Sequence, residues 1–357
     1  MPFHSPSPHG RQEARRPWPV STVLALVVAV LALGAAVAQE DAAYRVYVSN
    51  EYGADITVLD GSSHEIVQTI EISGRPGDVR PRGMAVSPDG RLIYVSVSDF
   101  FPQQQTPEDT IDVVDVVTNE VVQEIEAGGN PERVAISPDG SLVWASLEAI
   151  AQGGVYDADS GERLATFTVG IEPEGVGASP DGEWGYITAE TTHTVAVVDS
   201  ETFEVNKFVL VGNRPRVVVF SHDSSRAYVS AEIGGTVSVI DTSDHTVSAT
   251  ISLGLDSRPV GMALSPDGSR LYVAGGGTNA VYVVDTENNE LVATIREQMG
   301  RRPWDVAVSP DGSRVYTANG LSDSVSIIDT ESLSVVDNVS VGRGAHSVAI
   351  GRVPDAE

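Results

Sequence analysis

The sequence predicts an all-β protein, a seven-bladed β-propeller with four antiparallel strands in each blade. Three markers recur together along the 357 residues. A Ser-Pro-Asp-Gly turn starts at Ser87, Ser137, Ser179, Ser265 and Ser309, with a degraded copy, "SHDS", at Ser221. A strand with an aromatic residue follows each turn, and a third strand then ends in Asp. The markers repeat mostly every ~42 to 44 residues, which is the period of a propeller blade.

The turn explains how the first two strands of each unit meet. Proline presets φ at the first central position, and the following Asp accepts local backbone hydrogen bonds. Glycine then takes the left-handed conformation that lets two antiparallel strands pair. Each turn therefore predicts a hairpin between an apolar run such as "WDVAVSP" and an aromatic-bearing run such as "RVYTAN".

The second and third strands carry two further sets of residues in register. The aromatics of the second strands are expected to pack between blades: Tyr47, Tyr94, Trp144, Tyr186, Tyr228, Tyr272 and Tyr316. The carboxylates that end the third strands are expected to accept backbone N–H groups two residues on: Asp60, Asp115, Asp157, Asp199, Asp241, Asp285 and Asp329. Turn chemistry explains this second set better than a catalytic or metal-binding ring does.

The seventh blade is divided between the two ends of the chain. The N-terminal part supplies "RVYVSN", "ITVLD" and "EIVQTIEI" but lacks a first strand. The C-terminal run "HSVAIGR" aligns with a first strand and lacks everything after it. We therefore expect the N-terminal strands to pair with the C-terminal strand, which closes the ring and leaves no open sheet edge.

Composition excludes several classes of function. The chain has a formal net charge of −28, with 50 acidic and 22 basic residues, so its surface repels nucleic acid and anionic lipid. It has no cysteine. Disulfides, C-x-x-C-H haem attachment and thiolate metal sites are therefore excluded.

Residues 1–38 are predicted to be a secretory signal peptide, and residues 39–357 the propeller. Arg11, Arg15 and Arg16 precede an uncharged apolar stretch that ends in "AVA" before "QED". The alternative is an uncleaved N-terminal anchor, since the stretch is at the short edge of a membrane span. Cleavage predicts a periplasmic or secreted protein without membrane insertion, and we expect a monomer.

These residues resemble the YVTN-type β-propeller repeat over nearly all of the mature chain. Seven such repeats behind a leader are most similar to the propellers associated with PQQ-dependent alcohol catabolism. The resemblance implies an exported protein encoded beside quinoprotein dehydrogenases and a transport system, and hence a dehydrogenase or a transporter component as partner. A broader resemblance is to lactonase-like and cytochrome-d1-like propellers.

Arginines cluster where the chain approaches the central channel, on the face opposite the Ser-Pro-Asp-Gly turns. We predict a positive mouth that binds a partner protein or an anionic small molecule. The predicted binding residues are Arg80, Arg82, Arg214, Arg216, Arg258, Arg302, Trp304, His346, Phe100 and Phe101, and the same loops hold Arg75, Arg133, Arg301 and Arg343. The alternative is that these arginines pair with nearby acids and join blade to blade: Glu132, Glu174, Asp78 and Asp305.

Two enlarged loops mark one side of the mouth. Blade 2 carries "VSDFFPQQQTPEDT" between its second and third strands, and the connection before it reads "GRPGDVRPRG". Loops of this kind often carry recognition, so a partner footprint is expected there. A tolerated surface insertion is the simpler account.

The histidines limit the case for an enzyme. His64, His222 and His245 are expected on the turn face, and only His193 and His346 at the mouth. No catalytic residue, metal site or cofactor is assigned, and a d1-like haem would need those two histidines as axial ligands. The sequence favours a non-catalytic binding protein. The alternative is a lactonase-like hydrolase that uses mouth carboxylates or His346, with or without a divalent metal.

Overall fold

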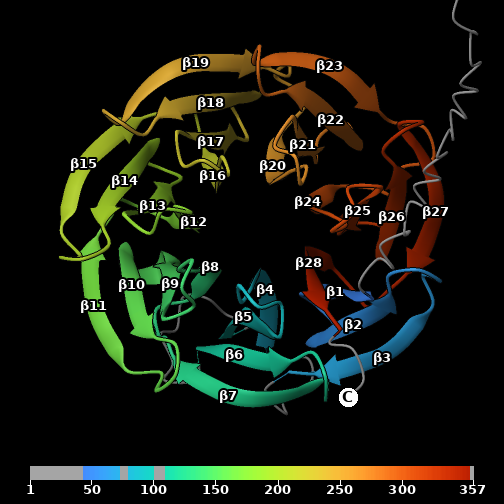
Figure 1. The fold of residues 1–357 in the computed structure, drawn as a ribbon, viewed down its shortest axis with the longest axis horizontal. Coiled ribbons are helices and arrows are strands. Elements are labelled where there is room, and N and C mark those ends of the chain that lie inside the picture. Colours follow the sequence, from blue (N-terminus) through green and yellow to red (C-terminus); the bar gives the residue numbers. More distant parts are fainter. Residues whose placement is uncertain (1–42, 73–78, 100–108, 354–357) are drawn as a thin grey trace, which may run out of the picture. The chain divides into compact units, whose positions relative to one another are not determined.

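The computed structural model describes residues 43–72, 79–99 and 109–353, and within them it contains seven four-stranded antiparallel sheets. Figure 1 shows the sheets arranged around a common centre, with β4, β8, β12, β16, β20, β24 and β28 innermost. The predicted seven-bladed, all-β propeller is confirmed.

The strands follow one another outward in each blade. Blade 1 contains β28 (Ala345–Arg352), β1 (Tyr44–Asn50), β2 (Asp55–Asp60) and β3 (Ile66–Glu71). Blade 2 contains β4 (Val79–Val86), β5 (Leu92–Asp99), β6 (Thr110–Asp115) and β7 (Glu120–Glu126). Blade 3 contains β8 (Pro131–Ile136), β9 (Leu142–Leu147), a short 3-10 helix η1 (Glu148–Ile150), β10 (Gln152–Asp157) and β11 (Arg163–Thr168).

The remaining blades repeat this order without a helix among the described residues. Blade 4 contains β12 (Pro173–Ala178), β13 (Trp184–Ala189), β14 (Thr194–Asp199) and β15 (Val205–Leu210). Blade 5 contains β16 (Pro215–Phe220), β17 (Arg226–Ala231), β18 (Thr236–Asp241) and β19 (Thr246–Ser252). Blade 6 contains β20 (Pro259–Leu264), β21 (Arg270–Gly275), β22 (Ala280–Asp285) and β23 (Glu290–Ile295). Blade 7 contains β24 (Pro303–Val308), β25 (Arg314–Asn319), β26 (Ser324–Asp329) and β27 (Ser334–Ser340).

The two ends of the chain complete blade 1 between them. Strand β1 pairs antiparallel with β28, with Val46 opposite Ile350 and Val48 opposite Val348. The last strand thus occupies the innermost position that the N-terminal part lacks, as the sequence predicts.

The Ser-Pro-Asp-Gly turns are held by their own side chains. At Ser87 the side-chain Oγ accepts the Leu92 N–H at 2.8 Å, and the Asp89 carboxylate accepts the Arg91 N–H at 3.0 Å. Gly90 has a φ of 76°, the left-handed conformation that the sequence predicts for it. The third-strand carboxylates are also used locally. Asp60 accepts the N–H groups of Ser62 and Ser63, and these bonds, led by that of Ser63, lower its pKa to about 2.

The second-strand aromatics join the blades. Tyr47 of blade 1 is buried in a cluster with Val95 and Val97 of blade 2, and Tyr316 of blade 7 is buried with Val46 of blade 1. The described residues form seven such clusters, and each contains the aromatic of one blade together with strands of the next. The predicted packing role is confirmed, and the apolar area buried between blades holds the ring together.

Candidate functional site

One residue in each innermost strand is turned toward the channel by a β-bulge. The pairing of the first two strands shifts just after the proline, as between Pro173 and Val176 of β12. A bulge inserts an extra residue into one strand and re-aims its side chain. The residue that follows the proline, or Ala345 in β28, lies at this shift in every blade. We call these seven residues the channel ring: Arg82, Glu132, Glu174, Arg216, Val260, Trp304 and His346.

Hydroxyl groups of the second strands fix the backbone of this ring. Ser49 Oγ donates to the carbonyl of Arg82 at 2.7 Å, and Ser146 Oγ donates to that of Glu174 at 2.6 Å. Corresponding bonds link the other pairs: Ser96 to Glu132, Thr188 to Arg216 and Ser230 to Val260. Each hydroxyl lies in the blade before the carbonyl it binds. The ring is therefore positioned between blades rather than by one blade alone.

Blades 1 to 3 contribute the first of two charge clusters. Arg82 is only 9% exposed, and its guanidinium contacts the carboxylates of Glu132 and, at 3.7 Å, Glu51. Glu148 lies 3.9 Å from the same guanidinium, and Arg80 lies 3.3 Å from Glu51. A buried guanidinium requires such partners because leaving it unpaired in a region of low dielectric is costly.

Blades 4, 5 and 7 contribute the second cluster, centred on Arg216. Its guanidinium lies 2.9 Å from Glu174 and also contacts Glu190. Glu232 is 2% exposed and lies between arginines, 3.4 Å from Arg214, 3.7 Å from Arg216 and 3.5 Å from Arg302.

Burial raises the pKa of Glu174 to about 7, although the positive charge of Arg216 opposes the shift. Its carboxyl shares a hydrogen bond with Glu190. Burial also acts to raise the pKa of Glu190, but this bond and the neighbouring arginines hold it below its usual value. The pair can therefore retain one proton near neutral pH.

An ion pair between distant blades connects the two sides of the ring. The guanidinium of Arg133 in blade 3 lies 3.1 Å from the carboxylate of Asp305 in blade 7. Ser347 of blade 1 donates a hydrogen bond of 2.6 Å to the same carboxylate. Arg133 and Asp305 are both largely buried, so the contact ties three blades together inside the molecule.

Trp304 and His346 form the aromatic part of the ring. Their rings are stacked, with centroids 5.7 Å apart and planes inclined by 27°. The Arg302 guanidinium lies 4.3 Å from the Trp304 ring centre, and that of Arg216 lies 5.5 Å from it. Burial lowers the pKa of His346 well below its usual value, and the charges of nearby arginines, first Arg82, lower it further. The imidazole is therefore neutral at physiological pH.

The acids around the channel change the expected picture of a positive mouth. Three of the four acids that the sequence analysis named, Glu132, Glu174 and Asp305, contact arginines as the alternative predicts. Asp78 lies outside the described residues. A further set of acids, not predicted from the sequence, lies on the second strands or just after them: Glu51, Glu148, Glu190 and Glu232. Each is the fourth residue after the second-strand aromatic, and that regular spacing could have revealed them.

Arginines without an ion pair to any described residue lie on the exposed part of the same face. We call this the channel face: it carries the connections into each innermost strand and the loops between second and third strands. Arg258, Arg301 and Arg343 are exposed there, and none forms an ion pair with a described residue. Arg214 is partly exposed, with 40% of its side-chain surface accessible. Phe100, Phe101 and Arg75 lie outside the described residues.

Exposed apolar side chains accompany these arginines. Leu255 is 76% exposed in the connection that holds Arg258, Leu321 is 60% exposed and Tyr52 is 47% exposed. The N–H of Leu321 donates to the carbonyl of Arg301, and the N–H of Tyr52 to that of Arg343. An arginine and an apolar residue thus lie side by side at successive blades. We call Leu255, Arg258, Arg301, Leu321, Arg343 and Tyr52 the docking arc.

The other histidine at the mouth has a structural partner. His193 Nδ1 lies 2.9 Å from the Glu190 carbonyl oxygen and 3.2 Å from the Arg214 backbone nitrogen. On the turn face, His245 hydrogen-bonds to the Tyr186 hydroxyl at 2.7 Å, and His222 contacts the Ser265 carbonyl at 3.0 Å.

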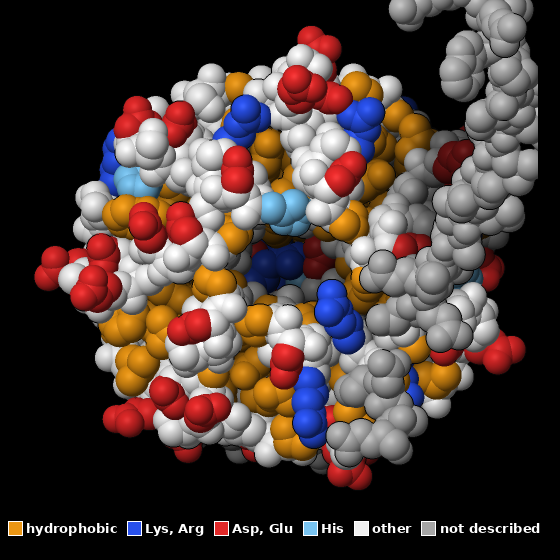
Figure 2. Space-filling view, in the orientation of Figure 1, with side chains coloured by type: hydrophobic (Ala, Val, Ile, Leu, Met, Phe, Trp, Pro, Cys, Tyr) orange, Lys and Arg blue, Asp and Glu red, His pale blue; other side chains and the backbone are white. Residues whose placement is uncertain are grey.

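Figure 2 shows acidic side chains spread around one face of the ring and a central hollow in which basic, acidic and histidine side chains lie.

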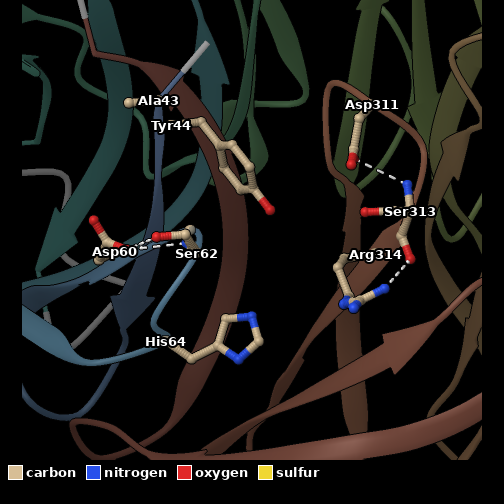
Figure 3. Close-up of a pocket in the computed structure, with 9 residues that line it drawn as sticks. Ala43, Tyr44, Asp60, Ser62, His64, Asp311, Ser313 and Arg314 are labelled. Carbon is tan, nitrogen blue, oxygen red and sulfur yellow. Dashed lines mark hydrogen bonds between the residues drawn. The ribbon is translucent and has the colours of Figure 1, made fainter. Parts of the chain in front are cut away.

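The turn face contains grooves between neighbouring blades. Figure 3 shows one of about 240 Å³ between blades 7 and 1, with Tyr44, His64 and Arg314 among the residues that line it. Tyr44 and Tyr316 exchange a hydroxyl–hydroxyl bond of 2.8 Å close by. Within residues 43–72, 79–99 and 109–353 no group of three or more His, Cys, Asp or Glu side chains is arranged to hold a metal ion. The same residues include no helix long and apolar enough to cross a membrane.

Comparison with known proteins supports the fold and one partial family likeness. Residues 208–336, which include blades 5 and 6 and most of blade 7, match the model of a family described as lactonase, 7-bladed beta-propeller. No curated protein matches the chain. Hydrazine synthase of Kuenenia stuttgartiensis is similar in structure, with a TM-score of 0.68 and 25% identity over 80% of this chain and 92% of that one.

Two further structures share the fold at lower identity. A functionally unknown protein of Desulfotomaculum acetoxidans matches with a TM-score of 0.73 and 17% identity, over 87% of this chain and 99% of that one. Dihydro-heme d1 dehydrogenase NirN in complex with DHE matches with a TM-score of 0.60 and 18% identity, over 83% of this chain and 63% of that one. The chain is therefore a seven-bladed β-propeller, similar over blades 5 to 7 to the lactonase family of propellers.

Proposed function

We propose that the protein is an exported, non-catalytic binding protein whose docking arc binds an acidic surface of a partner protein. The observation that carries the proposal is the exposure of Arg258, Arg301 and Arg343 without an ion pair to any described residue. The chain has a net charge of −28, so exposed cations gathered on one face form a local positive surface. Such a surface attracts an acidic surface on a partner protein.

The apolar members of the arc support a protein rather than an ion as the occupant. Leu255, Leu321 and Tyr52 each expose nearly half or more of their surface beside an arginine. Apolar and aromatic anchors flanked by arginine are typical of protein interfaces. Arginine also suits carboxylates because its planar fork binds them with two hydrogen bonds.

The resemblance to propellers of PQQ-dependent catabolism indicates which partners to test first. A quinoprotein dehydrogenase or a transporter component in the periplasm is the first choice. This choice rests on that resemblance and on the predicted leader at residues 1–38. The described arc lies on blades 6, 7 and 1, whereas most of the two enlarged blade 2 loops, where the sequence predicts a footprint, lies outside the described residues.

The test compares two variants with the same loss of charge. The arc variant carries Arg258→Ala, Arg301→Ala and Arg343→Ala, and the control carries Arg91→Ala, Lys207→Ala and Arg270→Ala away from the channel face. A photo-crosslinker at Leu321 identifies the partner from periplasmic extract, and its affinity is then measured at two salt concentrations. We expect the arc variant to bind at least tenfold more weakly and with a smaller salt dependence. Equal affinity of the arc variant and wild type would contradict the proposal.

A lactonase-like hydrolase is the second candidate, and two observations favour it. Residues 208–336 match the lactonase family of propellers, and burial holds the pKa of Glu174 at about 7, where a carboxyl can both donate and accept a proton. Lactone hydrolysis by the purified protein, with and without a chelator, tests this candidate. Activity that Glu174→Gln abolishes would support it, and absence of hydrolysis from a panel of lactones would remove it.

A further inference from the structure

His346 carries a buried nitrogen without a partner in a channel of charged groups. The residue is 6% exposed, and its Nδ1 has no hydrogen-bond partner among the described residues. Nearly all buried polar atoms of folded proteins are hydrogen-bonded, so an orphan at this position needs an explanation. The residue lies in the bulge of β28, the place in each blade where the innermost strand turns a side chain toward the channel.

A ring stack and hydrogen bonds of the flanking backbone position the imidazole. It stacks on Trp304, and the Ser347 N–H beside it donates to Ser49 Oγ at 3.0 Å. On its other side the Gly344 N–H donates to the Asp323 carboxylate at 2.7 Å. Groups fixed in this way before a ligand arrives lose little entropy when it binds.

A second buried nitrogen without a hydrogen-bond partner lies at the neighbouring ring position. Arg82 Nε is buried without a hydrogen bond, because its nearest acid, Glu51, is 3.7 Å away. The Nη1 nitrogen of this guanidinium contacts Glu132 and lies 3.9 Å from Glu148. Strands β28 and β4, which carry His346 and Arg82, are adjacent innermost strands.

The charges around His346 indicate which kind of ligand the two nitrogens would bind. The leading charged neighbours that act on its imidazole are all arginines: Arg82, Arg133, Arg216 and Arg80. A group that accepts hydrogen bonds and carries negative charge suits a site surrounded by these arginines. A planar carboxylate has two oxygens for two donors. A phosphate dianion would bring a second charge close to the buried carboxylates of Glu51 and Glu132.

We propose that the channel between His346 and Arg82 binds the carboxylate of a small organic acid. In the tautomer that carries its proton on Nδ1, His346 donates to one oxygen, and Nε–H of Arg82 donates to the other. This site is separate from the docking arc, whose arginines lie on the surface.

The test uses sodium acetate as the probe, with sodium chloride at equal ionic strength and acetamide as the uncharged isostere. We expect acetate alone to raise the melting temperature in a saturable way and to shift the His346 ring signals in a ¹⁵N–¹H spectrum. His346→Phe keeps the stack on Trp304 and removes the donor, and Arg82→Lys keeps the charge and removes Nε. Each is expected to weaken acetate binding at least tenfold.

Two control variants separate this proposal from the docking arc. His222→Phe on the turn face should bind acetate as wild type does, and so should the variant without Arg258, Arg301 and Arg343. If a ring variant fails to fold, the wild-type spectrum still decides. Unchanged His346 signals at high acetate, equal effects of acetate and chloride, or full affinity in folded His346→Phe would each overturn the proposal.

Discussion

Individual residues in the channel show how the fold keeps charge inside a β-protein. Glu174, Glu190 and Arg216 bring two carboxyls to one guanidinium, and the pKa of Glu174 rises to about 7 as a result of burial. The proton held between Glu174 and Glu190 and the guanidinium of Arg216 together compensate the charge of the two carboxyl groups. Several residues before the ring prolines also have positive φ, among them Arg214 at 62° and Arg258 at 48°, a conformation that costs free energy outside glycine. In this conformation the side chain of Arg258 is exposed and that of Arg214 is partly exposed at the channel face.

The shifted pKa of Glu174 predicts a particular pH dependence of stability. The folded protein holds this proton up to about pH 7, whereas the unfolded chain releases it near 4.5. Between these values the folded state binds more protons, so the stabilising contribution is complete below 4.5 and is lost as pH rises through 7. The free energy of unfolding of wild type, compared with Glu174→Gln, should therefore fall by about 2 kcal/mol between pH 5 and 8. Urea titrations across that range measure it, and a constant difference between the two proteins would refute the assignment. Glu190, Glu148, Arg82 and Arg216 face the group and are unchanged in the comparison.

The residue scale also shows where sequence reasoning stopped. The ring residues could be predicted because a proline marks their position in six blades and the aligned Ala345 marks it in blade 1. Their partners could not, because Arg133 and Asp305 are 172 residues apart and meet only across the closed ring. Glu190 and Glu232 were missed for a different reason. The predicted residues all lie near the innermost strands or in the blade 2 loop. Glu190 and Glu232 instead follow the second strands β13 and β17, and they contact the arginines of the channel from there.

Innermost strands pack closely because some of their positions lack a side chain. Gly175 of β12 faces the backbone of β16, and a Cβ placed on it would lie 2.9 Å from the Cα of Val217. Gly83 and Gly261 face the neighbouring strands β8 and β24 in the same way. Adjacent innermost strands therefore approach closely beside the bulges that carry the ring residues.

Substitution of one such glycine should therefore destabilise the fold strongly. In Gly175→Ala the new methyl group meets backbone atoms, Arg216 O and Val217 Cα, that cannot rotate away. We expect a loss of about 2 kcal/mol in the free energy of unfolding. In Gly276→Ala the nearest atom is Pro303 O at 3.3 Å, and the expected loss is under about 0.5 kcal/mol. Equal midpoints for the two variants in urea would show that the strands can move apart.

At the scale of the whole molecule, stability depends on closing the ring. Blade 1 takes β28 from one end of the chain and β1, β2 and β3 from the other. Its aromatic and apolar side chains pack on blade 2 on one side and blade 7 on the other. The repeat in the sequence was sufficient to predict this closure, because the missing first strand at one end matches the surplus strand at the other. The ion pairs of the two charge clusters could not be predicted in this way, because their partners meet only when the ring is closed.

A charge placed at the closure should disturb blades that lie far from it. Val348 of β28 is 6% exposed in the core between blades 7 and 1, and Val348→Asp should cost more than about 3 kcal/mol. Val336→Asp, at a position 51% exposed in β27, should cost less than about 0.5 kcal/mol. Hydrogen exchange followed by mass spectrometry would report protection blade by blade. Faster exchange in blade 4 as well as in blade 1 is expected. Loss of protection confined to blade 1 would show that the ring does not unfold as one unit.

The split blade also sets an order of events during synthesis. Strand β1 leaves the ribosome before every other described strand, and its inner neighbour β28 leaves last. Throughout translation of the blades between them, β1 keeps an unpaired edge of the kind that invites wrong pairing. A chain cut short before Ala345 would keep that edge permanently. Pairing of β28 with β1 is thus the event that removes the exposed edge, so a complete chain differs from a truncated one in whether that edge is covered.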